Sequence, residues 1–214
     1  MTQAAIGTMA PMVTSSNRPC LKPVQPSTRN VRVARLKIEL RQVRPKVWRR
    51  VLVPMGIRLN KLHVVLLRAM GWDGGHLHEF DFPDARFGIA DPDWPDELLM
   101  DESRVTLNQA LGNDAAFTWT YDLGDQWIHS VKVERIDALP AALKLKSPMC
   151  LAGAGACPPE DVGGAPGYEL FLQAIADPKH PEHANMLEWI GRPFAPQAFT
   201  VQEVQDRLDE IALS

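Results

Sequence analysis

The sequence predicts a single α+β domain, in which an antiparallel or mixed sheet of about five strands packs against one central helix and a C-terminal helical segment. Short runs of alternating apolar and polar residues have the period of half-buried strands. Residues 59–70 instead repeat apolar residues at three- and four-residue steps, the period of an amphipathic helix. At 214 residues, 45% hydrophobic and 23% charged, the chain is long enough for one compact core.

The N-terminal stretch differs in charge from the rest of the chain. Residues 1–38 hold six Lys or Arg and no acid, whereas the remainder holds 17 cations against 26 acids, a formal net charge of −9. Residues 1–32 are rich in Thr, Ser, Pro and Ala without periodicity, so we expect a disordered leader there and a folded domain over residues 33–214. Since an acidic body repels phosphate backbones, nucleic acid is expected to bind only through the basic N-terminal arm.

Two strands open the predicted domain. Alternating apolar and charged residues predict a half-buried strand over residues 35–41, and an Arg-Pro turn leads into a second strand over residues 46–53. Within the second strand, residues 48–50, Trp-Arg-Arg, are interpreted as a solvated cationic edge, because charged side chains rarely lie buried.

The helix expected at residues 59–70 has Asn60 near its N-cap and Gly71 beyond its last turn. A third strand is expected at residues 76–82, where an extended period resumes. The following residues, 83–104, are acidic and contain several prolines, which predicts a long surface loop. A short helix or turn over residues 105–111 then leads into the next strand.

A β-hairpin with an acidic tip follows. Alternation predicts strands over residues 116–121 and 127–136, joined by a turn around Gly124. Asp122 and Asp125 flank this glycine and lie at the tip of the hairpin.

The C-terminal part combines a glycine-rich loop with helices. Residues 150–167 hold so much Gly and Pro that neither a helix nor a central strand is expected, and an ordered loop is predicted. Three apolar stripes then predict three helices, the last of which begins with a capping box formed by Thr200 and Glu203.

Four segments together resemble a known family. They are Val-Trp-Arg-Arg within residues 36–54, Met-Gly-Trp through His-Leu-His-Glu-Phe at residues 70–80, Tyr-Asp-Leu-Gly-Asp-Gln-Trp-Ile-His at residues 121–129, and Cys-Pro-Pro-Glu-Asp-Val-Gly-Gly at residues 157–164, with the Gly-Tyr that follows. This pattern is similar to the plasmid Ri open-reading-frame-three-like family over roughly residues 33–200. The family commonly has Phe at the position of Leu123, a difference expected to affect only packing in the hairpin. The resemblance implies an α+β fold and no established activity.

Members of that family often carry the labels TnpR-like (resolvase) or insertion-sequence passenger, which connects them with plasmids and mobile elements. A serine recombinase requires an activated serine surrounded by arginines and a helix-turn-helix, and neither is visible in this sequence. Tyr121 lies beside an acidic turn and Tyr168 on an apolar helix stripe, so a tyrosine recombinase fits no better. The label is interpreted as genetic neighbourhood rather than activity.

The sequence favours a cytoplasmic protein without membrane association. No run approaches the ~18 apolar residues of a membrane span. Residues 1–20 lack the charged and apolar regions of a signal peptide. The three cysteines, Cys20, Cys150 and Cys157, are too few for a disulfide framework.

A metal site is the most specific chemical hypothesis. Cys150 and Cys157 flank a glycine loop that can fold back, and the expected strand faces that could meet it carry His76, His78 and His129. Of these, the proposed ligand set takes Cys150, Cys157, His78 and His129. Zinc favours such sulfur and nitrogen ligands in four-coordinate sites. The alternative is that both thiols are small buried side chains and that the histidines are satisfied by hydrogen bonds to Asp122 or Asp125.

Acid–base chemistry is a second hypothesis for the same place. A histidine between carboxylates can transfer protons near neutral pH, although the aspartates also have an ordinary role as turn formers. The Cys-Pro-Pro-Glu-Asp loop is the candidate partner of His129. The residues expected to line a pocket are His76, His78, Asp122, Asp125, Trp127, His129, Glu160 and Asp161.

Three functions remain open at this stage. The favoured one is a binding or interaction module for an unknown protein or small-molecule ligand, with a His/Cys/acidic pocket that is a candidate site for a metal such as zinc. The second is a hydrolytic or transfer enzyme that uses His129 with Asp and Glu groups. It is less favoured, because no residue of the sequence can be identified as a nucleophile. The third is a mobile-element accessory protein that binds nucleic acid through the basic N-terminal arm.

Overall fold

The computed structural model describes residues 30–89, 98–140 and 145–213. The predicted disordered leader therefore lies outside the described residues, except for its last three. Of these, Asn30 precedes the first strand, and Val31 and Arg32 are its first two residues. The proposed nucleic-acid arm likewise stays a prediction.

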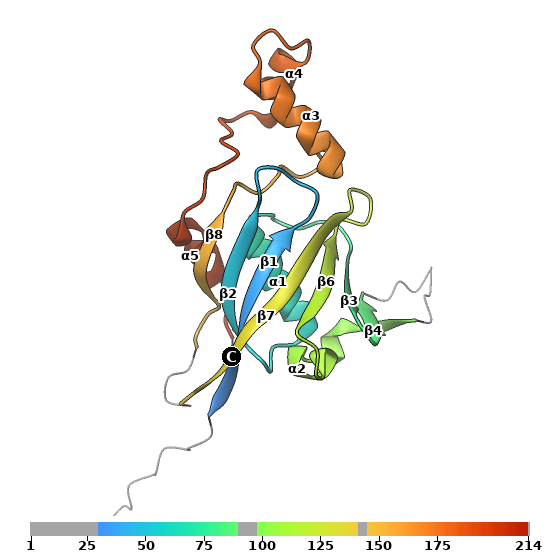
Figure 1. The fold of residues 1–214 in the computed structure, drawn as a ribbon, viewed down its shortest axis with the longest axis vertical. Helices are drawn as coiled ribbons and strands as arrows, with labels where there is room; N and C mark the ends of the chain where they lie inside the picture. Colours follow the sequence, from blue (N-terminus) through green and yellow to red (C-terminus); the bar gives the residue numbers. More distant parts are fainter. Residues whose placement is uncertain (1–29, 90–97, 141–144, 214) are drawn as a thin grey trace, which may run out of the picture.

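The fold is α+β, as predicted, and its centre is one mixed sheet (Figure 1). The sheet has eight strands rather than about five, in the order β5-β4-β3-β6-β7-β1-β2-β8. Among the strands of the described residues, β4 and β5 pair in parallel, and the other neighbours are antiparallel. The strands are β1 (Val31–Leu40), β2 (Trp48–Pro54), β3 (His78–Phe82), β4 (Ala85–Gly88), β5 (Leu99–Asp101), β6 (Ala116–Tyr121), β7 (Trp127–Leu139) and β8 (Met149–Ala154).

Three short strands account for the difference from the predicted number. β4 and β5 lie in the stretch predicted as an acidic loop, and they have too few residues to show an alternating pattern. β8 lies in the stretch predicted as a glycine loop, at the edge of the sheet. There Gly153 is required, because a Cβ would overlap the Phe199 ring and the backbone oxygen of Trp48. Glycine thus marks close packing against an edge strand rather than a loop.

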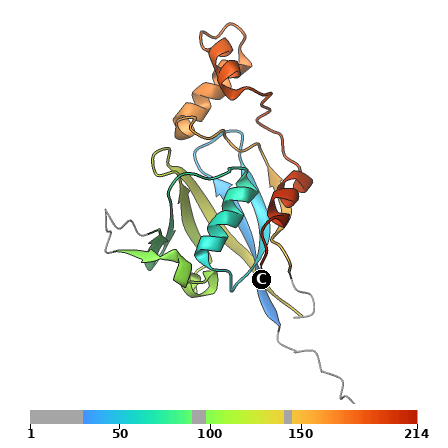
Figure 2. The same ribbon diagram turned by 180° about the vertical axis from the view of Figure 1, so that it is seen from behind.

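Helices cover one face of the sheet and extend beyond one end. Figure 2 shows α1 and α5 on the same face, whereas the α3–α4 pair projects past the end of the sheet (Figure 1). Gly71 ends α1 as predicted, and Asn60 lies two residues after the N-cap residue, Arg58. Thr200 caps α5 as predicted, accepting a hydrogen bond from the backbone N–H of Glu203. The helices are α1 (Leu59–Met70), the 3-10 turn η1 (Glu102–Arg104), α2 (Leu107–Leu111), α3 (Gly164–Ala176), α4 (His183–Ile190) and α5 (Val201–Asp209).

The core lies between the sheet and the layer of α1 and α5. The alternating residues Leu36 and Ile38 of β1 are fully buried there, together with Leu62 and Leu66 of α1. Aromatic side chains fill the part under β6 and β7. The largest fully buried aromatic side chains there are Trp72, Trp119, Trp127, Tyr121 and Phe80, and two more, Tyr168 and Phe171, are buried on α3.

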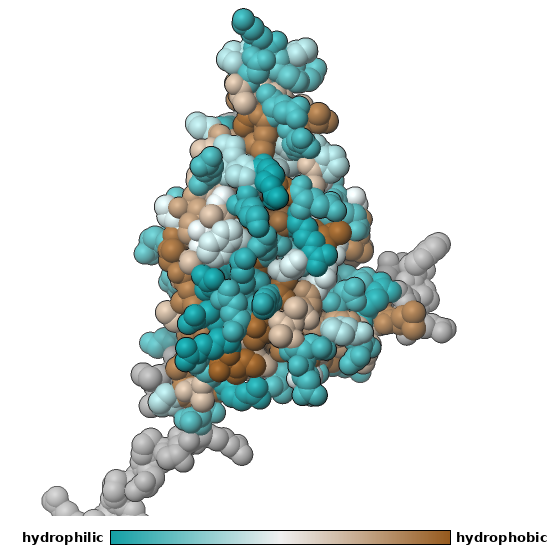
Figure 3. Space-filling view, viewed as in Figure 1, coloured by the Kyte–Doolittle hydropathy of each residue, from teal (hydrophilic) through white to brown (hydrophobic). Residues whose placement is uncertain are grey.

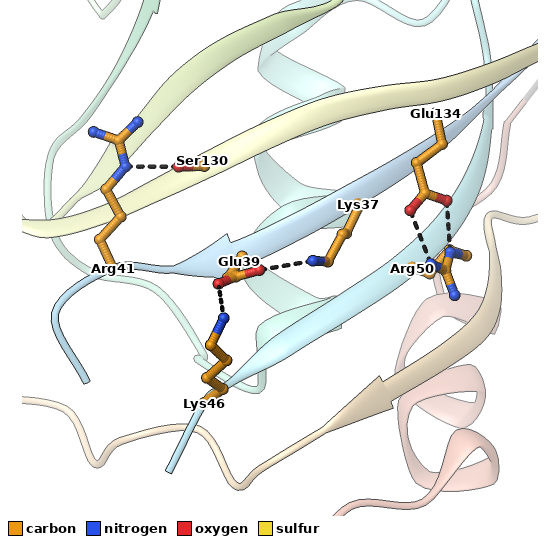
Figure 4. Close-up of polar contacts among 7 residues, drawn as sticks. All are labelled: Lys37, Glu39, Arg41, Lys46, Arg50, Ser130 and Glu134. Atoms are coloured by element: carbon orange, nitrogen blue, oxygen red, sulfur yellow. Dashed lines mark hydrogen bonds and ion pairs between the residues drawn. The ribbon is translucent and has the colours of Figure 1, made fainter. Parts of the chain in front are cut away.

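The opposite face of the sheet is largely polar (Figure 3). Ion pairs cross this face, as drawn in Figure 4: Lys37 and Lys46 both contact Glu39, and Arg50 of β2 reaches across β1 to Glu134 of β7 through two bonds of 2.6 and 2.8 Å. Lys37 and Glu39 are alternate residues of β1, and Arg50 and Glu134 belong to β2 and β7, whereas Lys46 precedes β2. Alternation along a strand separates a solvated face from a buried one.

Strand register places one end of the sheet beside the predicted pocket. The β6–β7 turn lies at this end, which we call the turn end, and so do the end of β1 at Leu40, the start of β2 at Trp48 and the end of β8 at Ala154. The described chain begins at the opposite end, where Val31 pairs with Leu139.

Candidate functional site

Three side chains converge at the turn end. His76, Asp122 and Asp161 each offer a ligand atom, and these atoms lie within 4.8 Å of one another. The His76 ring lies between the two carboxylates, with Nδ1 3.5 Å from Asp122 and Nε2 3.3 Å from Asp161. Imidazole nitrogen and carboxylate oxygen are ordinary ligands of divalent metal ions.

The tight β6–β7 turn positions Asp122. Its backbone is left-handed, with φ 55°, a conformation that Asp tolerates better than most residues. Its Oδ1 accepts hydrogen bonds from the backbone N–H groups of Gly124 (2.9 Å) and Asp125 (3.2 Å). The other oxygen, Oδ2, is therefore left to face His76.

The loop after β8 brings Asp161 to the same place. Asp161 also has a left-handed backbone, with φ 55°. The loop is tied to the hairpin by Asp125, whose Oδ2 accepts a hydrogen bond from the N–H of Gly163 at 3.1 Å. Gly164 adds a close approach, since a Cβ there would overlap the backbone oxygen of Asp125. These contacts fix the position of the loop relative to the hairpin.

Glu160 lies beside this cluster. Its Oε1 accepts a hydrogen bond from the hydroxyl of Tyr121 at 3.1 Å, and its Oε2 lies 4.0 Å from His76 Nε2. Among the described residues, Oε2 is buried without a hydrogen-bond partner. Burial raises the pKa of the Glu160 carboxyl, and the hydrogen bond from Tyr121 partly opposes this. A carboxyl of this kind can hold a proton that an exposed one would release.

Other predicted pocket residues lie in the core instead. Trp127 and His129 are at most 1% exposed, and His129 Nδ1 lies 3.2 Å from the backbone oxygen of Trp119. Burial lowers the pKa of His129 to about 3, so the ring is neutral at physiological pH. Its partner is thus the neighbouring strand rather than the Cys-Pro-Pro-Glu-Asp loop.

His78 is buried in a separate polar contact. Its Nε2 lies 2.8 Å from Glu102, and its ring stacks on that of His63 with 3.3 Å between centroids. Burial lowers the pKa of His63 to about 3. Neither of these partners was singled out from the sequence. His63 adjoins the apolar stripe of α1, a signal that could have identified it, whereas Glu102 resembled any other acid of the predicted loop.

The two described cysteines belong to neither cluster. Cys150 and Cys157 are free thiols, and burial raises the pKa of both. Within the described part of the chain, the one grouping of His, Cys, Asp and Glu suited to a metal is His76, Asp122 and Asp161. The four predicted zinc ligands, Cys150, Cys157, His78 and His129, therefore do not form such a group. Both histidines have polar partners, but these are Glu102 for His78 and the backbone oxygen of Trp119 for His129, rather than the expected Asp122 or Asp125.

The sequence is similar to known proteins. The sequence pattern of the family described as "Plasmid pRiA4b ORF-3-like protein" matches residues 32–203. The chain belongs to this family. It is 45% identical over 183 residues to the "Uncharacterized protein y4hQ" of Sinorhizobium fredii (strain NBRC 101917 / NGR234), covering 84% of this chain and 92% of that protein.

A solved structure shares the fold of this family member. The crystal structure of a protein of unknown function, MM3350, from Methanosarcina mazei Go1 aligns with a TM-score of 0.72 and 31% identity. The alignment covers 82% of this chain and 98% of that one. These descriptions name neither an activity nor a recombinase, so the function has to be argued from the site. Within the described residues, no helix is long and apolar enough to cross a membrane.

Proposed function

We propose that this family member binds a divalent metal ion through His76, Asp122 and Asp161. The observation that carries the proposal is the convergence of their ligand atoms within 4.8 Å from three separate segments. Backbone hydrogen bonds occupy Asp122 Oδ1 and leave Oδ2 directed at the cluster. Zinc is the first ion to test, because it accepts mixed nitrogen and oxygen ligands and often uses three protein ligands with one open position.

A second candidate function is hydrolysis assisted by the metal. Glu160 favours it, because this partly buried carboxyl with a raised pKa lies next to the His76 ring. It could take a proton from a water molecule bound at the open position. In this scheme Glu160 replaces His129 as the proton-transferring group.

Metal binding can be tested by zinc titration of chelator-treated protein without a histidine tag. The wild type is expected to bind one equivalent. Asp122→Asn keeps the Oδ1 acceptor that organises the turn and replaces Oδ2 by an amide nitrogen, so it should weaken binding by roughly tenfold or more, the range of a lost interaction of about 1.4 kcal/mol. Asp161→Asn should weaken zinc binding to a similar extent. Because the Asp161 side chain is 72% exposed, this substitution should not affect folding, and weaker binding can be attributed to the lost ligand.

The matched control is Asp73→Asn. Asp73 is 92% exposed and pairs with Arg68, outside the cluster, so its loss should leave zinc affinity unchanged. Calorimetry and elemental analysis would report the stoichiometry. Absence of stoichiometric zinc binding by the wild type, or equal affinity in all three variants, would refute the proposal.

A further inference from the structure

Arg49 is a cation in the interior of the protein. The sequence suggested a solvated edge for residues 48–50, but strand alternation directs Arg49 to the helix-covered face, where it is 2% exposed. Its neighbours Trp48 and Arg50 point to the open face, where Arg50 pairs with Glu134 and lies over the Trp48 ring. The interpretation of the run as a cationic edge is thus wrong for its middle residue.

The contacts of Arg49 are all with uncharged groups. Its guanidinium donates hydrogen bonds to the backbone oxygens of Ala69 (2.9 Å), Met70 (3.2 Å), Trp48 (2.9 Å) and Ala154 (3.0 Å). These use four of its five N–H groups. No described carboxylate forms an ion pair with it, and the nearby thiols of Cys150 and Cys157 have raised pKa values.

Its positive charge is therefore only partly balanced. Ala69 and Met70 supply free carbonyls at the C-terminus of α1, which carries a partial charge of roughly −0.5. Arginine does not lose its proton in proteins, so the remaining charge needs an anion. A buried charge without compensation is unfavourable.

A cavity of about 560 Å³ opens beside Arg49, within the range of small-ligand pockets. Two further arginines, Arg192 and Arg207, line it, and neither forms an ion pair with a described acid. Arg207 donates from Nε to the backbone oxygen of Arg68, which leaves its terminal nitrogens available. Phe199 forms part of the wall, 4.8 Å from the Arg49 guanidinium.

Three acids also line the cavity, and two of them have partners elsewhere. Asp73 pairs with Arg68, and Glu160 is bonded to Tyr121 and has a raised pKa. Glu203 lies in the first turn of α5, where its backbone N–H is bonded to Thr200. The arginines thus dominate the charge available to a ligand.

From this arrangement we propose that the cavity binds a small phosphate monoester, with its phosphate on Arg49, Arg192 and Arg207 and its apolar part against the aromatic wall. Arginine binds phosphate oxygens through paired N–H groups, which Arg192 and the terminal nitrogens of Arg207 can supply, whereas Arg49 has one N–H group left and contributes chiefly its charge. Three positive charges suit a dianion better than a monoanionic carboxylate. The site is distinct from the proposed metal centre, although Glu160 borders both.

The test is calorimetric titration of metal-free protein at low ionic strength with phenyl phosphate, inorganic phosphate and benzoate. Phenyl phosphate is expected to bind most tightly, because it engages both the arginines and the aromatic wall. Removing the metal separates this result from the zinc experiment, so either proposal can fail alone.

The variants avoid Arg49, whose contacts also hold α1 and β8. Arg207→Gln and Arg192→Ala should each weaken phenyl phosphate binding tenfold or more, whereas Arg207→Lys should retain part of it. The control is Arg104→Ala, a side chain 84% exposed on η1, which should bind as the wild type does. The proposal is overturned if the wild type binds no phosphate probe, if benzoate binds as tightly as phenyl phosphate, or if Arg207→Gln and Arg192→Ala leave affinity unchanged.

Discussion

His129 is a titratable group at the centre of an aromatic core. Its Nδ1 must donate its hydrogen bond, because the partner is the backbone oxygen of Trp119. Nε2 then carries a lone pair and has no partner among the described residues. Protonation would place a charge in an apolar environment, which is why the pKa falls to about 3.

This residue makes stability depend on pH. In the unfolded chain His129 takes up a proton as the pH falls through its ordinary value of 6.5, whereas the folded protein resists protonation until about 3. The unfolded state therefore binds more protons between these values, and stability falls as pH falls, by up to about 1.4 kcal/mol per pH unit from this residue. His129→Phe should flatten the decline measured by urea unfolding between pH 7.5 and pH 4.5. An unchanged slope would contradict the assignment.

The pocket residues expected from the sequence can be compared with their positions in the structure. Four pocket candidates, His76, Asp122, Glu160 and Asp161, lie close together in the structure. The acids could be selected from the sequence because turn-forming residues and a glycine-rich loop have a recognisable local pattern. Which histidine would face the acids was not predictable. That depends on where β3 begins: His78 is its first residue and points into the core, whereas His76 precedes it.

At the scale of elements, the β6–β7 turn and the loop after β8 form one unit. Asp125 joins them through its bond to Gly163. Asp125→Ala should lower the free energy of unfolding by about 1 kcal/mol, the value of a typical hydrogen bond. It should also weaken zinc binding, because Asp161 depends on this loop. Urea denaturation and zinc titration of the same variant would measure both.

The control for that change is Asp137→Ala on β7. Asp137 pairs with Arg135 at the surface, and such pairs contribute about 0–1 kcal/mol. Its zinc affinity should equal that of the wild type. Equal stability and equal zinc affinity in the two variants would show that the turn and loop are not coupled through Asp125.

Elements with a clear period were predictable, and those defined by distant partners were not. β1, β2, α1 and α5 carry their own alternation, stripe or cap. β5 has three residues, and pairing with β4 is what makes it a strand. Similarly, β8 is a strand because the edge of β2 is available to it. Local sequence cannot supply such information.

At the scale of the whole molecule, the C-terminal helix completes a core begun by the first strand. Val204, Leu208 and Ile211 are at most 7% exposed. Burying each such side chain contributes roughly 1.5–3 kcal/mol, so truncation after Ala198 should remove about 5 kcal/mol. For a protein of this size the midpoint of thermal unfolding should fall by roughly 10–20 °C, measured by circular dichroism. A midpoint within about 3 °C of the wild type would show that α5 is dispensable.

The position of the chain end has a practical consequence for measuring binding. The backbone N–H of Leu213 bonds to Lys146, and the C-terminal end lies far from the α3–α4 pair in Figure 1. The proposed metal site and the arginine cavity are at the turn end, where β8 finishes at Ala154. Protein attached to a biosensor surface through its C-terminus would therefore keep the proposed metal site and the arginine cavity on the side away from the surface, accessible to ligand in solution.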